Sequence, residues 1–178
     1  MTAVAWSRVA VVVMVTVVLQ EAVLNGVVIG GAHPDAFVAL AVAAGLTSGP
    51  QRGAVIAFGI GLVADLFVLT PFGLSALVYV IVAFGAGATA SLGSGRAPYG
   101  FSMVVALAAG IAATLLFELI ETLIDQPQLP SAELAAVAAV VGVANLVLIV
   151  PAKAALARAV RSRPARELAG VSGGSALR

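Results

Sequence analysis

Long apolar runs, separated only by short stretches rich in Pro, Gly and Ser, cover most of this 178-residue chain. Hydrophobic residues make up 62% of it and charged residues only 10%, with a mean hydropathy of +1.16. A soluble domain carries roughly 25% charged residues. The composition therefore excludes a soluble domain and predicts an all-α integral membrane protein. The length allows about six spans of roughly 20 residues joined by short loops.

The apolar runs predict a six-transmembrane-helix bundle in a single domain over residues 1–160, with residues 161–178 as a basic, disordered cytoplasmic tail. The expected spans are 9–30, 36–48, 53–69, 74–92, 101–124 and 132–151. The second span is short for a hydrocarbon core of about 30 Å. With six spans and an inside N-terminus, however, Arg8, Arg52, Arg96 and the basic tail all become cytoplasmic, as the positive-inside rule requires. We therefore expect both termini to be cytoplasmic.

A carboxylate interrupts the third run, in the segment GIGLVADLFVLTPFGLSAL from Gly59 to Leu77. An acid at the centre of a membrane helix costs about 2.5–3.5 kcal/mol, so Asp65 needs a hydrogen-bonding partner, a proton or a wet cavity. Pro71, Phe72 and Gly73 follow it, and Pro and Gly are typical of a tight turn. We expect Asp65 either to brace this turn by accepting backbone N–H groups near Phe72 and Gly73, or to accept a donor from a partner protein.

Four carboxylates fall in the outer half of the predicted bundle: Glu21, Asp65, Glu118 and Glu121. Because no Lys or Arg lies in that half, the sequence predicts an acidic, outward-facing pocket. The plainer interpretation is that several of these acids, Glu121 above all, are simply hydrated near the outer interface. The chain has no Cys and one His, so neither a metal site nor a catalytic set is expected, and we predict no cofactor, no enzymatic activity and no nucleic-acid partner.

Small residues form a second pattern, which is typical of helices that approach one another closely. They recur every four positions on the fourth run, as Ala83, Gly87 and Ser91. In the third run, Gly59 and Gly61 leave two positions without a side chain. Packing within the bundle is the favoured interpretation, and self-association through the same stripe is the alternative.

The block from Pro50 to Ala90 resembles the central signature of the rod shape-determining protein MreD family. The resemblance rests on two glycines, an acid and a turn, followed by the letters LSAL: Gly59, Gly61, Asp65, Pro71 and Gly73. It implies a non-enzymatic membrane scaffold of the bacterial cell-elongation complex, located in the cytoplasmic (inner) membrane. Such a scaffold binds the extracytoplasmic protein MreC and supports peptidoglycan synthesis by RodA and its penicillin-binding transpeptidase. The implied fold is similar to the substrate-binding subunit of energy-coupling-factor transporters.

The residues themselves also allow a second function, that of a substrate-capture subunit of a vitamin-type energy-coupling-factor transporter. The cluster of acids without cations favours it, because such a pocket suits a small cationic or hydroxylated solute. Aromatic residues make up only 6% of the chain, which argues against a site for a flat vitamin. The basic tail is expected to contact anionic membrane lipids.

Overall fold

The structure, a computed structural model, describes residues 3–29, 31–67, 71–92, 98–124 and 131–160. Within these residues the regular structure is helical, apart from an isolated antiparallel bridge between Ile29 and Ala32. The helices in chain order are α1 (Ala3–Ala22), the short 3-10 helix η1 (Leu24–Gly26), α2 (Ala36–Ser48), α3 (Pro50–Ala64), α4 (Leu74–Ser91), α5 (Tyr99–Leu123) and α6 (Ser131–Val160). The expected all-α class is confirmed for this part of the chain. The predicted tail, 161–178, lies outside the described residues.

Helix α2 is the centre of the bundle. Every residue from Ala36 to Gly45 is buried, and α3, α4, α5 and α6 all pack against this helix. Its sequence is apolar on all sides, as a helix enclosed by neighbours requires. Gly49 ends α2 with a φ of +81°, and Pro50 begins α3 directly after it. Since Pro is well suited to the first turn of a helix, the chain reverses here without a longer loop.

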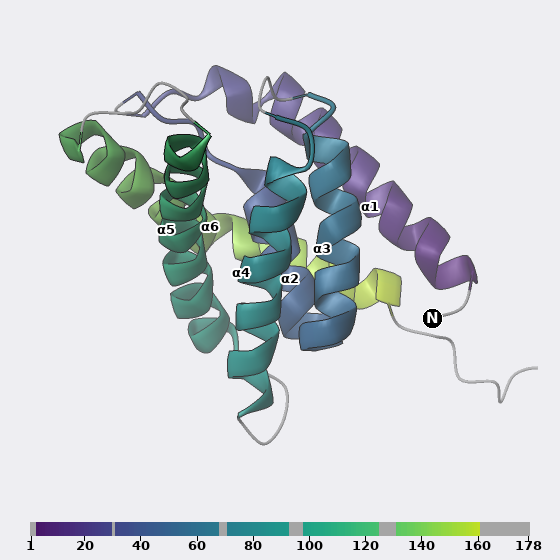
Figure 1. Cartoon of the computed structure of the whole chain (residues 1–178). Coiled ribbons are helices and arrows are strands. Elements are labelled where there is room, and N and C mark those ends of the chain that lie inside the picture. The colour runs from purple at the N-terminus through teal and green to yellow at the C-terminus, as the bar shows by residue number, and fades with distance from the viewer. Residues whose placement is uncertain (1–2, 30, 68–70, 93–97, 125–130, 161–178) are drawn as a thin grey trace, which may run out of the picture.

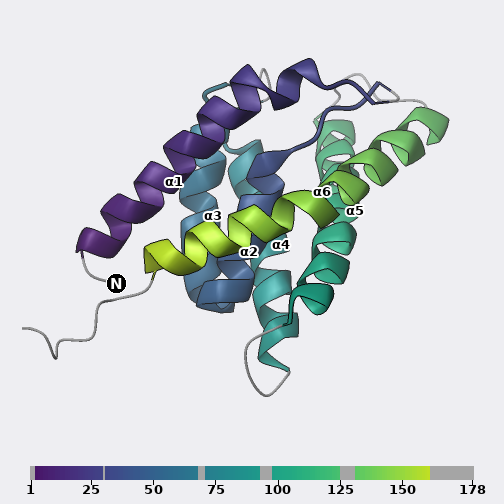
Figure 2. The same ribbon diagram turned by 180° about the vertical axis from the view of Figure 1, so that it is seen from behind.

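Helices α3, α4 and α5 stand side by side, whereas α1 and α6 cross the other side of α2 at a slant (Figures 1 and 2). Helix α1 is held by a stripe with a period of four residues, made by the buried side chains of Ala5, Val9, Val13 and Val17. The start of α1 and the end of α6 lie near the same end of the molecule (Figure 2). Most of the remaining α1 surface is exposed.

Glycines let the backbones of α2, α3 and α4 touch. A Cβ added to Gly53 would lie 2.5 Å from the Cα of Gly45, and one added to Gly87 would lie 2.6 Å from the Cα of Pro50. Ala83 is fully buried on the same face of α4 as Gly87. This part of the predicted small-residue stripe therefore packs within the chain.

Gly61 packs as expected, since it lies against Ala76 so closely that a side chain would clash. Gly59 and Ser91, which were also expected to pack, behave differently. Gly59 is exposed and has no atom within 4 Å of an added Cβ, so its expected packing role is corrected. It faces outward because α4 meets α3 on the opposite side, through Gly61. Ser91 is exposed as well, and its hydroxyl donates to the carbonyl of Ala88 at 2.6 Å.

Helices α1 and α3 differ from the expected spans at their ends. Helix α1 begins at Ala3 and ends at Ala22, earlier at both ends than the span 9–30, and η1 follows at Asn25 and Gly26. Asn and Gly favour turns over continued helix, which explains the break. Helix α3 ends at Ala64 rather than at 69, because the next residue uses its side chain to organise a turn.

Helix α6 runs past Pro151, where the predicted span ended, to Val160. Proline removes one backbone donor, which would otherwise bond the carbonyl of Val147, and the rest of the helical hydrogen bonding survives. Prolines are tolerated in this way in membrane helices. The apolar periodicity beyond Pro151 includes Leu156 and Ala159, both buried, which holds the last turns against the bundle.

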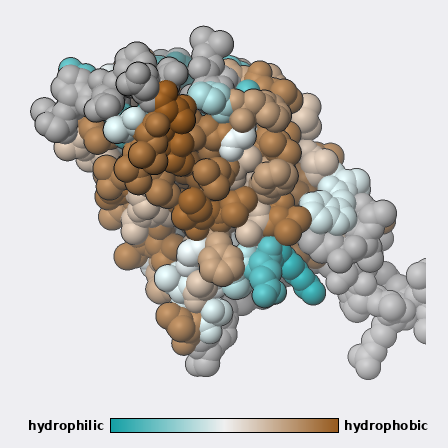
Figure 3. Space-filling view, in the orientation of Figure 1, coloured by the Kyte–Doolittle hydropathy of each residue, from teal (hydrophilic) through white to brown (hydrophobic). Residues whose placement is uncertain are grey.

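Within the described part of the chain, four helices are long and apolar enough to cross a membrane: Val4–Gly26, Leu74–Ser91, Tyr99–Leu123 and Glu133–Val160. Helices α2 and α3 have 13 and 15 residues, which reach only about 20 and 22 Å at 1.5 Å per residue. On the face shown in Figure 3, apolar residues cover most of the middle, and the strongly hydrophilic residues in view lie away from it. These features indicate a membrane protein.

Candidate functional site

Asp65 is the least exposed carboxylate among the described residues. It follows the last residue of α3 and is only 6% exposed. Its Oδ2 accepts the backbone N–H of Gly73 at 2.8 Å, and its Oδ1 accepts that of Ser75 at 3.0 Å. Both donors belong to the start of α4, so one side chain ties the end of α3 to the beginning of α4. Of the two roles expected for Asp65, this geometry is that of the turn brace.

The turn that Asp65 closes is built around Gly73. This residue has a φ of +98°, a left-handed conformation that glycine adopts without a steric penalty. The N–H of Leu74 donates to the carbonyl of Pro71 at 3.1 Å, and that of Leu77 donates to the carbonyl of Gly73 at 3.0 Å. Phe72 is exposed at the outer side of the turn. The turn therefore presents an aromatic ring outward on a backbone that is fixed from within.

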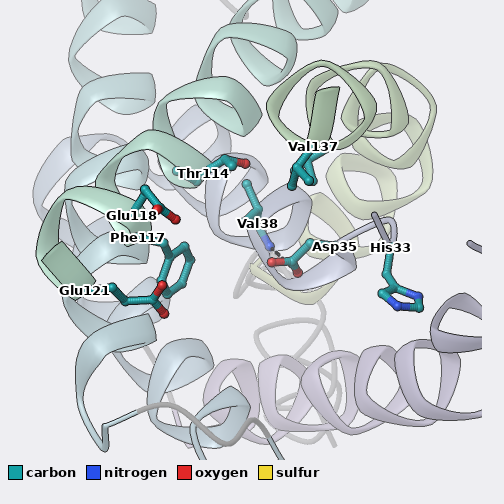
Figure 4. Close-up of a pocket in the computed structure, with 10 residues that line it drawn as sticks. His33, Asp35, Val38, Thr114, Phe117, Glu118, Glu121 and Val137 are labelled. Atoms are coloured by element: carbon teal, nitrogen blue, oxygen red, sulfur yellow. Dashed lines mark hydrogen bonds between the residues drawn. The ribbon is translucent and has the colours of Figure 1, made fainter. Parts of the chain in front are cut away.

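The remaining acids do not all gather as the sequence predicted. Glu118 and Glu121 line a cavity of about 250 Å³ together with His33, Asp35 and Thr114 (Figure 4). The two glutamates come from α5 and face Asp35 at the start of α2 (Figure 4). The ring of Phe117 lies between the two glutamates in this view.

A larger cavity, of about 720 Å³, adjoins the first, since His33, Asp35 and Val137 line both. Glu21 lines only this larger cavity, and Asn25 donates to its carboxylate at 3.0 Å. Asp65 lines neither cavity, because it is enclosed by the turn. The predicted four-acid pocket is corrected to two adjoining cavities that hold Glu21, Glu118 and Glu121 but not Asp65.

Asp35 joins the two cavities and was not singled out by the sequence. Its Oδ1 caps α2 by accepting the N–H groups of Phe37 at 2.8 Å and Val38 at 3.2 Å, and its Oδ2 accepts the hydroxyl of Tyr79 at 3.1 Å. Burial raises the pKa of the Asp35 carboxyl above its ordinary value, although these three hydrogen bonds oppose the rise. Tyr79 in turn packs edge-on against Phe117, with ring centroids 6.1 Å apart.

Gln20 is the second residue of the candidate site that the sequence did not reveal. Its Oε1 accepts the N–H of Ala36 at 2.9 Å, and its Nε2 donates to the carbonyl of Pro34 at 3.0 Å and to Oδ1 of Asn25 at 2.9 Å. One amide in the wall of the large cavity therefore fastens the end of α1 to the start of α2. The sequence signal for Gln20 was a polar amide within an apolar run. The signal for Asp35 was an aspartate directly before a helix, where this residue type often acts as a cap.

Charge is segregated along the bundle. The described acids lie where α1, α3 and α5 end and α2 and α6 begin, and they are Glu21, Asp35, Asp65, Glu118, Glu121 and Glu133. The described cations lie at the opposite end, where α1 and α3 begin and α6 ends, and they are Arg8, Arg52, Lys153 and Arg158. Lys153 is anchored there, since its Nζ donates to the hydroxyl of Ser102 at 2.6 Å and lies 5.0 Å from the centroid of the Tyr99 ring.

No three His, Asp or Glu side chains among the described residues are grouped so that they would hold a metal ion. Comparison of the chain with protein-family models, with curated proteins and with solved structures finds no match.

Proposed function

We propose that this protein is a non-enzymatic scaffold of the bacterial cell-elongation complex, of the MreD type. The observation that carries the proposal is the brace between Asp65 and the N–H groups of Gly73 and Ser75. It gives a physical role to Asp65, Gly73 and Ser75, which all lie in the block that resembles the MreD signature. A rigid α3–α4 hairpin with Phe72 exposed at its tip is the kind of preorganised element that a binding partner needs.

The proposed arrangement in the membrane follows from the charge segregation. Six helices cross the bacterial cytoplasmic membrane, with α2 and α3 as short, enclosed spans. The end that carries Arg8, Arg52, Lys153 and Arg158 faces the cytoplasm, in keeping with the positive-inside rule. The acidic cavities and the Asp65 turn then face outward. This is the side from which the extracytoplasmic scaffold MreC, and with it RodA and the penicillin-binding transpeptidase, would be reached.

A transporter subunit is the second candidate, and the large cavity favours it. Its volume of about 720 Å³ falls within the range of about 300–1,000 Å³ that is usual for small-molecule sites. Its polar lining of Gln20, Glu21 and Asn25 suits a hydroxylated or cationic solute. The substrate-capture subunit of an energy-coupling-factor transporter would use such a cavity.

Affinity purification from cross-linked native membranes, followed by mass spectrometry of the chains recovered, separates the two functions. A single-span extracytoplasmic scaffold together with cell-wall synthases is the expected recovery. Recovery of ATPase subunits with a coupling membrane subunit would overturn the scaffold proposal in favour of transport. A tagged membrane protein of similar size, expressed at the same level, serves as the control for chains that are recovered non-specifically.

A further inference from the structure

An apolar groove runs between α1 and α6 on the side of the bundle shown in Figure 2. Val11, Val15 and Leu19 of α1 form one wall, Leu148 and Ala155 of α6 form the other, and Leu40 of α2 contributes to the floor. Val11, Val15 and Leu19 are all at least 40% exposed. The groove therefore lies open at the side of the bundle, on helices that are long enough to cross a membrane.

The groove is long enough for part of an acyl chain and too narrow for a helix. From Val11 to Leu19 it follows α1 for about 12 Å at 1.5 Å per residue, close to the depth of one leaflet, which is half of about 30 Å. Its volume is about 220 Å³, or roughly seven times the 30 Å³ that a water molecule takes in the liquid. A helix about 10 Å across does not fit into that space.

Positive charge flanks one end of the groove. Arg8 lies three and seven positions before Val11 and Val15, so it shares their face of α1 one turn closer to the start of the helix. Arg158 lies three positions after Ala155 and continues the α6 wall in the same way. The start of α1 and the end of α6 are at the same end of the molecule (Figure 2). Arg8 and Arg158 therefore extend the two walls towards the end of the groove at which a lipid headgroup would meet it.

We propose that this groove binds one acyl chain of an anionic phospholipid, with the phosphate held by Arg8 and Arg158. Arginine suits this role because its planar donors match phosphate oxygens. In the membrane orientation proposed above, this end faces the cytoplasmic leaflet, where a negative surface potential attracts basic residues. The proposal concerns the opposite end of the molecule from the acidic cavities and stands independently of the scaffold role.

Native mass spectrometry of the full-length protein tests the proposal after reconstitution in vesicles with equal amounts of dioleoyl phosphatidylglycerol and dioleoyl phosphatidylcholine. The wild type is expected to retain phosphatidylglycerol in preference to phosphatidylcholine. Arg8→Gln and Arg158→Gln should each reduce that preference about five-fold, since each variant loses the hydrogen bonds of one guanidinium to the lipid phosphate. Arg52→Gln is the matched control, because Arg52 lies at the same end but lines a separate hollow with Trp6 and Gln51.

A groove-filling substitution supplies the second arm. Ala155→Phe should abolish retention of the bound lipid, whereas Val18→Phe, on the exposed side of α1 and outside the groove, should leave it unchanged. Equal retention of the two lipids would overturn the proposal, as would an equal loss in Arg52→Gln or unchanged retention in Ala155→Phe. A dimer that dissociates when Ala155 is replaced would overturn it too, since a second copy would then be the occupant.

Discussion

The Asp65 carboxylate holds the backbone N–H of Gly73 at 2.8 Å, which joins the end of α3 to the start of α4 across the turn between them. The second carboxylate oxygen holds the N–H of Ser75, so both oxygens of one buried side chain are used. An acid that looks costly in an apolar run is thereby satisfied by backbone donors that the turn itself exposes. The same bonds fix the direction in which α4 leaves the turn.

Asp65→Ala should lower the free energy of unfolding by about 2–4 kcal/mol, because it leaves two buried N–H groups without an acceptor. Asp65→Asn should lose about half as much, since one carboxamide oxygen remains. Thermal unfolding in detergent measures both effects. Glu21→Gln is the control, an exposed acid outside the turn. Unchanged unfolding of Asp65→Ala would contradict the brace.

Gly73→Val should destabilise the protein by about 1–3 kcal/mol through backbone strain, since Gly73 has a φ of +98°. Crowding is not the cause, because no atom lies within 4 Å of an added Cβ. Gly59 has the same open surroundings but lies inside a helix, so Gly59→Ala should be neutral or stabilise by up to about 1 kcal/mol. A comparison of the two melting temperatures tests this, and equal losses would show that φ is not the determinant.

Gly87→Leu should strongly impair folding, because an added Cβ would lie 2.6 Å from backbone atoms of Pro50. Neither backbone can move without separating α4 from the α2–α3 hairpin, so the cost should be at least the roughly 1–3 kcal/mol typical of overpacking. Gly85→Leu, two positions earlier on the open face of α4, should be tolerated. Yield of monodisperse protein in detergent is the measurement. Similar yields from the two variants would argue against close contact between these helices.

Asp35→Ala should cost about 1 kcal/mol or more, because it removes the cap of α2 and leaves the Tyr79 hydroxyl without its acceptor. Asp35→Asn keeps the capping oxygen and removes the buried charge, so its stability should be close to that of the wild type. Thermal unfolding of the two variants under identical conditions makes the comparison. A loss of the same size in Asp35→Asn would show that the charge, and not the cap, is required.

The pH dependence of stability provides a separate test at Asp35. Burial raises the pKa of this carboxyl in the folded protein, so the folded state binds a proton at higher pH than the unfolded state does. The contribution of Asp35 to stability is therefore complete below the ordinary pKa of an aspartate, and it is lost as the pH rises through the raised value. The melting temperature of the wild type, relative to that of Asp35→Asn, should therefore fall as the pH rises through the raised pKa. A difference that does not vary with pH would contradict the raised pKa.

Sequence periodicity locates the helices well because apolar runs and turn residues are local signals. The span 36–48 coincides with α2, and the runs at 74–92 and 101–124 match α4 and α5 to within two residues at each end. The end of α3 differs because it depends on a side chain that acts at a distance. The end of α3 is set by Asp65 reaching Gly73 and Ser75, which a hydropathy pattern does not encode.

The candidate site was less predictable, because spacing along one helix does not say which helices meet. Glu118 and Glu121 share a face of α5, and the structure places both on one cavity. Whether Glu21 or Asp65 lines the same cavity depends on the tilt of α1 and on the turn after α3, and tertiary packing sets both. Gly59 and Gly61 show the same limit, since two glycines in one helix pack in opposite ways.

Quantitative co-purification from cross-linked native membranes tests the scaffold role most directly, with wild type and Asp65→Ala compared at equal amounts of folded protein. The wild type is expected to recover an MreC-type extracytoplasmic scaffold with cell-wall synthases, and Asp65→Ala, with a loosened α3–α4 turn, is expected to recover much less. Recovery of transporter ATPase subunits, or of no elongation-complex protein at all, would contradict it.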